Sequence, residues 1–409
     1  MDSVTSILNR AFIEHWKSFT FFLLDKVYNI QPLHITMKVE SLIIDNLKSF
    51  KRETQIKFGN FNIFVGKNAS GKSSMMQIAQ AILHSRPYAQ LNIRPYDGNF
   101  EAVSICKCQI KFEKEDINEM IKGPLESNIS QRTLSYNLEA LKHLDPLDIT
   151  KVWHRNLSHG VEIHFPQLQE MDSSHFRTIN HPVRTVGRSQ IFIQDDSFFQ
   201  SISDLIVTKS IFVPDTRDLS ISFPLTYNSN NPIDPNNILT HVTNWKLNDR
   251  PTYEKFIGYA QKILPEIEDL KIDLLVTSGN VSLKEKDLRT VLPGGNISKG
   301  SREVLVLLSA LVLAKRKSLV FIEEPEIHLH PAAVRKLKEI MIELIEEKGL
   351  QLIISTHDPI FLADLHPEKN KDVKFFRFQK QVQQGSSVSE VESDKDVSDL
   401  LDELEYPTK

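Results

Sequence analysis

The sequence predicts an α/β fold built on a parallel sheet, with a glycine-rich loop of the P-loop kind between a strand and a helix. A short apolar run, Phe61–Val65, leads into the glycine-rich segment GKNASGKS, and a helix-like run over residues 74–83 follows it. Towards the C-terminus, two further buried-strand patterns alternate with two helical patterns. Strands that alternate with helices form a parallel sheet that is covered on both faces.

The glycine-rich segment fits the pattern G-x-x-x-x-G-K-[ST] from Gly66 to Ser73. Glycines let the loop curl so that its N–H groups point at phosphate oxygens, and the following helix adds its N-terminal dipole. Lys72 then reaches the β- and γ-phosphates, and Ser73 binds Mg²⁺. The alternative is a glycine-rich turn that binds nothing, which the correct flanking elements disfavour. The predicted nucleotide contacts are Gly66, Lys67, Asn68, Ala69, Ser70, Gly71, Lys72, Ser73 and Ser74.

The next apolar run, residues 318–322, ends in two carboxylates, Glu323 and Glu324. A carboxylate at the C-terminal end of a parallel strand lies at the ligand-binding edge of the sheet. We expect Glu323 to hold Mg²⁺ and Glu324 to activate the attacking water as general base. The alternative is that both charges simply begin an exposed loop. A helix over 331–347 and a second buried strand over 351–355 follow, and that strand places His357 near the same edge as a sensor of the γ-phosphate.

Ser298 and Gly300 precede a helix predicted from about Arg302 to Lys315. Backbone N–H groups and the Ser298 hydroxyl would form a second anion cradle there, which need not serve the loop of the same chain. A plain helix N-cap is a common explanation of an S-x-G segment, and on this segment alone it is favoured over the anion cradle.

Composition bounds the function classes. The chain has 409 residues, 40% hydrophobic and 25% charged, with a net charge of −4, so nucleic-acid binding would need a local basic patch. Its two cysteines, Cys106 and Cys108, are spaced for one face of a strand and are expected to stay free in a reducing cytoplasm. No run approaches the roughly 18–20 apolar residues of a membrane span, and no secretory signal is visible.

The chain divides into regions of different character. Residues 1–36 form an N-terminal extension with three open interpretations: a docked helix, a dimer-contact arm, or the product of a reading frame upstream of Met37. Two strands around a turn are expected over 37–58. The head is expected at 37–84 and 290–380, and a proline-rich inserted region at 85–289. The inserted region contains strand-like runs at 102–112, 161–165, 190–194 and 211–213, and helical patterns at 238–245 and 252–263. Its prolines exclude a long coiled coil. We expect the acidic tail, 381–409, to be disordered, although its leucines have helical spacing.

Four segments, in order, now carry a resemblance: FVGKNASGKSS, ISKGSRE, FIEEPEIHLHP and STHDP. They resemble ABC-type ATPases of the SMC, Rad50 and RecF kind, and more closely the compact AAA-family ATPases related to OLD proteins, many of which act in anti-phage defence. LIIDNLKSFKRETQIKF is similar to the opening strand pair of that family, and IFVPDTR matches in outline. The resemblance implies an ABC-type head, ATP and Mg²⁺ as ligands, and a homodimer or higher even oligomer. In that dimer, Ser298 and Gly300 bind the γ-phosphate of the partner's ATP, and Glu326 and HLHP lie in a loop that crosses between subunits.

Two features depart from the family pattern. The first acidic position is usually Asp, whereas Glu323 adds a methylene that displaces its carboxylate by about 1.5 Å. Only residues 358–409 follow His357, too few for the nuclease domain of OLD proteins. We therefore expect an ATPase that controls a separate nuclease or toxin effector, or a nucleic acid, with no membrane partner. A transport-type ABC ATPase is an alternative that the long stretch between Ser73 and Ser298 disfavours. An ATP-sensing scaffold with little turnover is another, favoured only by Glu323.

Overall fold

The computed structural model divides the chain into two compact units, Met1–His34 and Ile35–Lys409. It describes residues 37–84, 95–96, 104–112, 147–154, 161–164, 205–215, 217, 222–224, 235–274, 278–363, 365, 372–381 and 383–404. The predictions for residues 1–36 and for a strand at 190–194 lie outside the described residues. No helix within the described ranges is long and apolar enough to cross a membrane.

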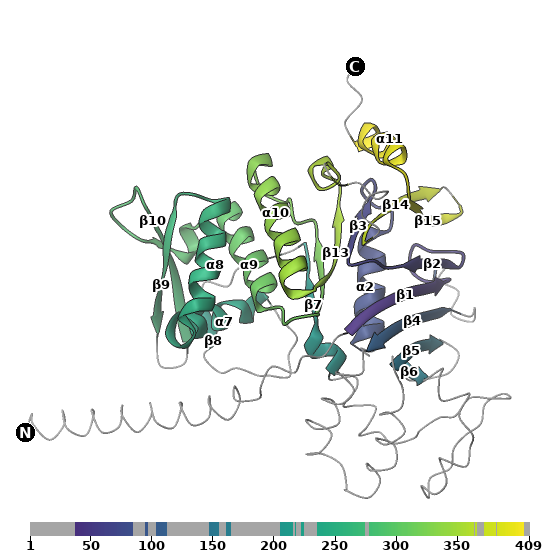
Figure 1. Cartoon of the computed structure of the whole chain (residues 1–409), viewed down its shortest axis with the longest axis horizontal. Coiled ribbons are helices and arrows are strands. Elements are labelled where there is room, and N and C mark those ends of the chain that lie inside the picture. Colours follow the sequence, from purple (N-terminus) through teal and green to yellow (C-terminus); the bar gives the residue numbers. More distant parts are fainter. Residues whose placement is uncertain are drawn as a thin grey trace, which may run out of the picture. The chain divides into compact units, whose positions relative to one another are not determined.

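A six-stranded sheet forms the centre of the second unit, in the order β15-β14-β3-β13-β12-β7 (Figure 1). All neighbours from β14 to β7 pair in parallel, and β15 joins the edge antiparallel. The strands are β3 (Phe61–Val65), β7 (Ser210–Val213), β12 (Leu319–Glu323), β13 (Gln351–Thr356), β14 (Val373–Gln381) and β15 (Gly385–Val391). The predicted α/β class and parallel core are confirmed, and the predicted strands at 61–65, 211–213, 318–322 and 351–355 agree to within a residue or two.

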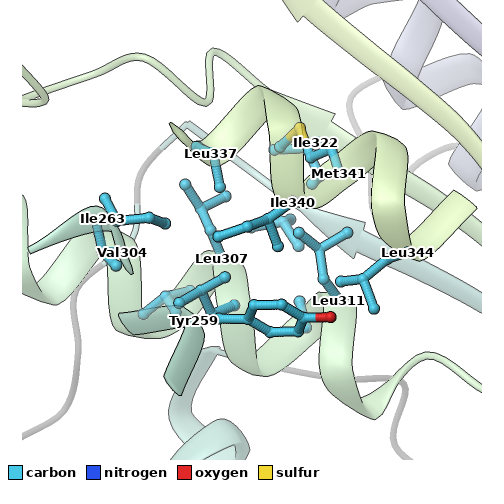
Figure 2. Close-up of a cluster of buried hydrophobic side chains, with 14 of the residues drawn as sticks. Tyr259, Ile263, Val304, Leu307, Leu311, Ile322, Leu337, Ile340, Met341 and Leu344 are labelled. Carbon is cyan, nitrogen blue, oxygen red and sulfur yellow. The ribbon is translucent and has the colours of Figure 1, made fainter. Parts of the chain in front are cut away.

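Four helices pack together on one face of this sheet: α7 (Pro235–Asn248), α8 (Arg250–Ile263), α9 (Lys299–Leu313) and α10 (Pro331–Lys348). The side chains labelled in Figure 2 are part of this layer and come from α8, α9, α10 and β12. Val320 and Ile322 point into it, as do alternate residues of β3 and β13. Each fully buried aliphatic side chain stabilises the folded state by roughly 1.5–3 kcal/mol relative to an exposed one. Most of the buried apolar side chains of the cluster lie in this layer, which is therefore the main apolar core.

Helix α2 (Lys72–Leu83) lies on the opposite face of the central sheet. Phe321 stacks on Phe212 with ring centroids 4.2 Å apart, and Phe212 meets His84, at the C-terminal end of α2, at 5.0 Å. Beyond α2 lies a second, antiparallel sheet in the order β2-β1-β4-β5-β6. Its strands are β1 (Met37–Asp45), β2 (Thr54–Lys57), β4 (Ile105–Phe112), β5 (Leu147–His154) and β6 (Val161–His164). The expected strand pair at 37–58 is thus β1 and β2.

Cys106 and Cys108 alternate with exposed residues along β4, so both side chains point to the same buried face. Neither forms a disulfide. This agrees with the prediction from their spacing.

A smaller antiparallel sheet precedes α9. Strand β10 (Ser278–Glu285) pairs with β8 (Ser222–Pro224), β9 (Ile267–Leu274) and β11 (Leu292–Pro293). A short 3-10 helix, η4 (Gly294–Asn296), then leads into α9. Helix α9 begins at Lys299, three residues before the predicted start, because Ser298 is its N-cap.

The expectation of a disordered tail is wrong for residues 385–404. β15 pairs with β14 along its whole length, and α11 (Asp394–Leu404) follows it. Val391, Val397 and Leu400 are buried in the main core cluster, whereas Asp396 and Asp399 are exposed. The acidic residues thus lie on the solvent side of an amphipathic helix, and its apolar side provides the burial that a disordered chain lacks.

Candidate nucleotide-binding site

The glycine-rich loop runs from the end of β3 to the start of α2. Gly71, the N-cap of α2, has a φ of 114°, and a Cβ there would lie 2.6 Å from the Ser386 hydroxyl, so only glycine fits. Lys72 donates from Nζ to the Gly66 carbonyl at 2.6 Å. No side chain caps the first turn of α2, which leaves its N–H groups directed into the loop.

The two residues predicted to hold Mg²⁺, Ser73 and Glu323, meet at the edge of the central sheet. Glu323 ends β12, and the Ser73 side chain hydrogen-bonds to its carboxylate. Burial, together with the charges of Asp215 and Glu324, raises the pKa of Glu323 to about 7, against the lowering effects of Ser73 and Lys48. A hydroxyl beside a carboxylate is a hard-oxygen donor pair of the kind that Mg²⁺ accepts. A nearby cation would favour the ionised carboxylate.

Glu324 follows in a left-handed backbone conformation, with a φ of 42°, that is uncommon for a residue with a side chain. Its N–H donates to the Ser355 carbonyl at 2.8 Å, and its side chain is 24% exposed. Its carboxylate therefore stays accessible beside the glycine-rich loop. Glu324 is also the largest of the carboxylate influences that raise the pKa of Lys72 against the lowering effect of burial.

His357 lies beside the carboxylates of Glu324 and Glu326. Its Nδ1 is 3.3 Å from Glu326 Oε1 and 3.9 Å from Glu324 Oε1. Glu326 is buried and also accepts from the Thr356 hydroxyl at 2.7 Å and the His357 N–H at 3.0 Å. Burial raises the pKa of Glu326. These contacts give Glu326 a bracing role between the β12 and β13 ends, and leave Glu324 as the exposed candidate base.

Ser298 and Gly300 lie at the N-terminus of α9, on the other face of the sheet from α2. The Ser298 hydroxyl accepts from the Ser301 N–H at 3.1 Å, which is the plain N-cap arrangement. A Cβ on Gly300 would lie 2.9 Å from the His328 carbonyl, so glycine permits this close approach. The anion cradle remains a prediction.

The two histidines of HLHP make contacts within the chain. His330 caps α10 through its Nδ1, which accepts from the Ala332 N–H at 3.3 Å. His328 Nδ1 is 3.6 Å from Glu303 Oε1. Within the described ranges, no group of three or more His, Cys, Asp or Glu side chains has the arrangement of a metal site.

Sequence reasoning missed three charged residues at this edge: Lys48, Asp215 and Arg217. The Lys48 ammonium lies near Glu323 and hydrogen-bonds to Gln77, and burial lowers its pKa. Arg217 donates from Nη2 to the carbonyls of Glu323 and Glu324 at 2.6 and 2.7 Å. The segment IFVPDTR, which contains two of them, resembled the family in outline, but nothing in its pattern assigns a role to them.

Comparison with known families decides the identity of the fold. A family described as "AAA domain, putative AbiEii toxin, Type IV TA system" matches residues 154–363, and an "AAA ATPase domain" family matches residues 37–145. The first match covers just over half of the chain, so the chain belongs to that AAA-domain family. The two matches together take in the glycine-rich loop, Glu323, Glu324 and His357.

Curated relatives match this AAA protein over short segments. The Old nuclease of Escherichia phage P2 is 44% identical over 52 residues, which are 13% of this chain and 9% of the relative. The OLD nuclease of Thermus scotoductus is 37% identical over 86 residues, 20% of this chain and 16% of the relative. The matches therefore span less than a fifth of either nuclease, and relate the ATPase to OLD proteins.

Solved structures agree on the architecture. The AAA protein is similar to an Smc head bound to the C-winged helix domain of ScpA, with a TM-score of 0.52, 15% identity, and coverage of 87% of this chain and 99% of that one. An Smc head with an extended coiled coil, bound to the C-terminal domain of ScpA derived from Pyrococcus furiosus, is similar with a TM-score of 0.51 and 13% identity. This match covers 90% of this chain and 99% of that one. The fold is thus that of an SMC-head-like P-loop ATPase, as the motifs predicted.

Proposed function

We propose that the AAA protein binds and hydrolyses ATP with Mg²⁺, as a dimer of heads. The observation that carries the proposal is the hydrogen bond between Ser73 and Glu323, with Glu324 next in the chain. Residues that are far apart in the sequence meet at the carboxyl edge of the sheet, where P-loop proteins hold metal and phosphate.

Each residue has a distinct role in this proposal. Lys72 and the N–H groups of the glycine-rich loop bind the phosphates. Ser73 and Glu323 hold Mg²⁺, which when bound neutralises charge on the phosphate oxygens. Glu324 orients the attacking water and takes its proton, and His357 senses the γ-phosphate.

The placement of the two proposed half-sites supports a dimer. The glycine-rich loop and α2 are on one face of the central sheet, and the Ser298 end of α9 is on the other. Two heads that face each other bring the Ser298 and Gly300 of one chain to the ATP of its partner. Closure then depends on ATP, and hydrolysis opens the dimer.

We further propose that this cycle controls a separate effector, or a nucleic-acid transaction, in anti-phage defence in the cytoplasm. The likeness to OLD nucleases and the toxin–antitoxin description of the family support this setting. The segment after His357 forms β14, β15 and α11. In this proposal, a nuclease or toxin activity is supplied by another protein.

The test is steady-state ATP turnover by the purified chain with Mg²⁺, together with its mass in solution with and without ATP. We expect turnover that requires Mg²⁺ and a doubling of mass with ATP. Tight ATP binding with turnover at the background rate would instead favour the ATP-sensing scaffold, in which Glu323 holds the metal too loosely for catalysis. A protein that binds no ATP contradicts both.

A further inference from the structure

Arg217 lies just after β7, between helix α9 and the turn that follows β12. Its side chain has 0% exposure. One nitrogen, Nη2, donates to two consecutive carbonyls, those of Glu323 and Glu324. The guanidinium thus supports the backbone of the turn that presents the proposed metal ligand and general base.

The other side of the guanidinium faces α9. Arg217 Nε lies 3.1 Å from Glu303 Oε2, and the Glu303 side chain is only 6% exposed. Glu303 is on the helix that Ser298 caps, and its other oxygen lies 3.6 Å from His328. A continuous set of buried contacts therefore joins the Ser298 end of α9 to the turn at Glu323 and Glu324.

Stability alone explains this arrangement poorly. Arg217 Nη1 is buried and has no hydrogen-bond partner within the described residues, and such donors are costly. Buried ion pairs are also weak contributors to stability compared with apolar residues of similar size. The left-handed conformation of Glu324 persists only if its surroundings hold it. These features are typical of a contact that holds a turn, here the one at Glu323 and Glu324, in one conformation.

We propose that Arg217 is a positioning residue for ATP hydrolysis, and that its pair with Glu303 couples α9 to the catalytic turn. The inference rests on the proposed ATPase function. In a dimer, Ser298 of a chain serves one ATP, whereas Glu323 and Glu324 of the same chain serve the other. The Arg217–Glu303 pair then connects the two ATP sites through each chain.

Arg217→Lys tests the positioning because lysine keeps the charge but lacks the planar fork. We expect kcat to fall about 10- to 100-fold while KM for ATP stays within about threefold, because the phosphate-binding loop is untouched. The matched control is Arg250→Lys, at the exposed Arg250–Glu254 pair, which should leave both constants unchanged. An unchanged kcat in Arg217→Lys overturns the inference.

Hydrogen exchange provides a readout that does not require turnover. The Glu324 N–H donates to the Ser355 carbonyl of β13, and the Ile327 N–H donates to the Glu324 carbonyl. Both amides should exchange at least about tenfold faster in Arg217→Lys than in the wild type. Unchanged exchange at these amides also overturns the positioning. A wild type that lacks turnover contradicts the proposed function, yet the exchange measurement still decides whether Arg217 holds the turn.

A double variant covers the case in which Arg217→Lys fails to fold. Arg217→Met with Glu303→Met removes both buried charges together, so neither is left unpaired, and the melting temperature should remain near that of the wild type. It should still show the low kcat and the fast exchange, since the donor to the carbonyls is gone. A kcat equal to that of the wild type in this variant overturns the inference.

The coupling has its own test. Glu303→Gln keeps the shape of the side chain and weakens its attraction to Arg217, so the Hill coefficient for ATP should fall from above 1 toward 1. A Hill coefficient equal to that of the wild type overturns the coupling between sites, whatever the change in kcat.

Discussion

At the scale of single residues, the candidate site is defined by which carboxylate remains accessible. Glu323 bonds to Ser73, and Glu326 is buried against Thr356 and His357. The Glu324 side chain is 24% exposed, and its position in the chain puts it next to the proposed metal ligand, Glu323. These different environments support the different roles that we propose for the three neighbouring glutamates.

Lys72→Ala should abolish ATP binding. The variant removes the side-chain cation at the β- and γ-phosphates, whose Nζ is held at the loop by the Gly66 carbonyl. Equilibrium binding of a fluorescent ATP analogue measures the loss, with Lys336→Ala, at an exposed lysine of α10, as the control. Unchanged affinity in Lys72→Ala would show that the loop does not bind phosphate in this way.

Glu324→Gln should keep ATP binding and lose hydrolysis. The amide preserves the shape but takes no proton, a loss of about 10²–10⁴ in rate. The trapped ATP state should appear as a stable dimer by light scattering. Turnover at the wild-type rate would instead move the role of base to Glu323 or Glu326.

Acid sensitivity should depend on His241, in α7. Burial lowers its pKa to about 4, from about 6.5 in the unfolded chain. Between these two pH values the unfolded chain therefore binds a proton at His241 that the folded protein does not bind. Its contribution to stability is complete above pH 6.5 and declines as the pH falls toward 4. Between pH 7.5 and 5.0 the loss is about 2 kcal/mol. Urea titrations at these two pH values measure the free energy of unfolding. Between them, this free energy should fall by about 2 kcal/mol less in His241→Gln than in the wild type. An equal fall in both proteins would show that His241 does not titrate in this way.

At the scale of elements, the predicted parts are those with strong local signals. β3, β12 and β13 are short apolar runs with a motif at one end, and α8 and α10 have clear periodicity, so their bounds were close. β9, β10, β14 and β15 carry mixed polar sequences, and they become strands only through pairing with partners that the sequence does not identify. Arg217 was missed for a related reason, since it acts on backbone carbonyls that any sequence would supply.

The folded C-terminus can be tested directly. Leu400 of α11 is 2% exposed and belongs to the main core cluster. Leu400→Ala should lower the free energy of unfolding by about 2 kcal/mol or more. Asp399→Ala, one position earlier on the exposed side, should have an effect within about 0.5 kcal/mol. Equal, negligible effects would restore the disordered tail.

At the scale of the whole molecule, the fold separates the two halves of the proposed site onto opposite faces of one sheet. The glycine-rich loop and α2 are on one face, and Ser298 and α9 are on the other. If the cradle at Ser298 binds ATP, a second copy must supply the opposite half. Subunit exchange between two inactive variants can therefore reveal whether the sites are shared.

Ser298→Arg and Lys72→Ala damage different halves of each shared site. In a mixed dimer the intact glycine-rich loop of one chain faces the intact Ser298 of the other, so one site is complete and its twin is doubly broken. In random exchange about half the dimers are mixed, each with one good site of two. Activity should recover to about a quarter of the wild type, and to less if the sites are coupled.

Recovery is impossible if each chain carries a full site of its own, since every chain then lacks one essential half. A mixture that exchanges subunits yet stays at background would mean either such self-contained sites or two sites that must fire together. A crosslink between cysteines placed at Lys67, an exposed position of the loop, and at Ser298 separates these outcomes, because shared sites link two chains and self-contained sites link only within one. The Arg217–Glu303 pair gives the second outcome a physical basis, and Glu303→Gln in both chains of the mixture should then raise the recovery toward a quarter.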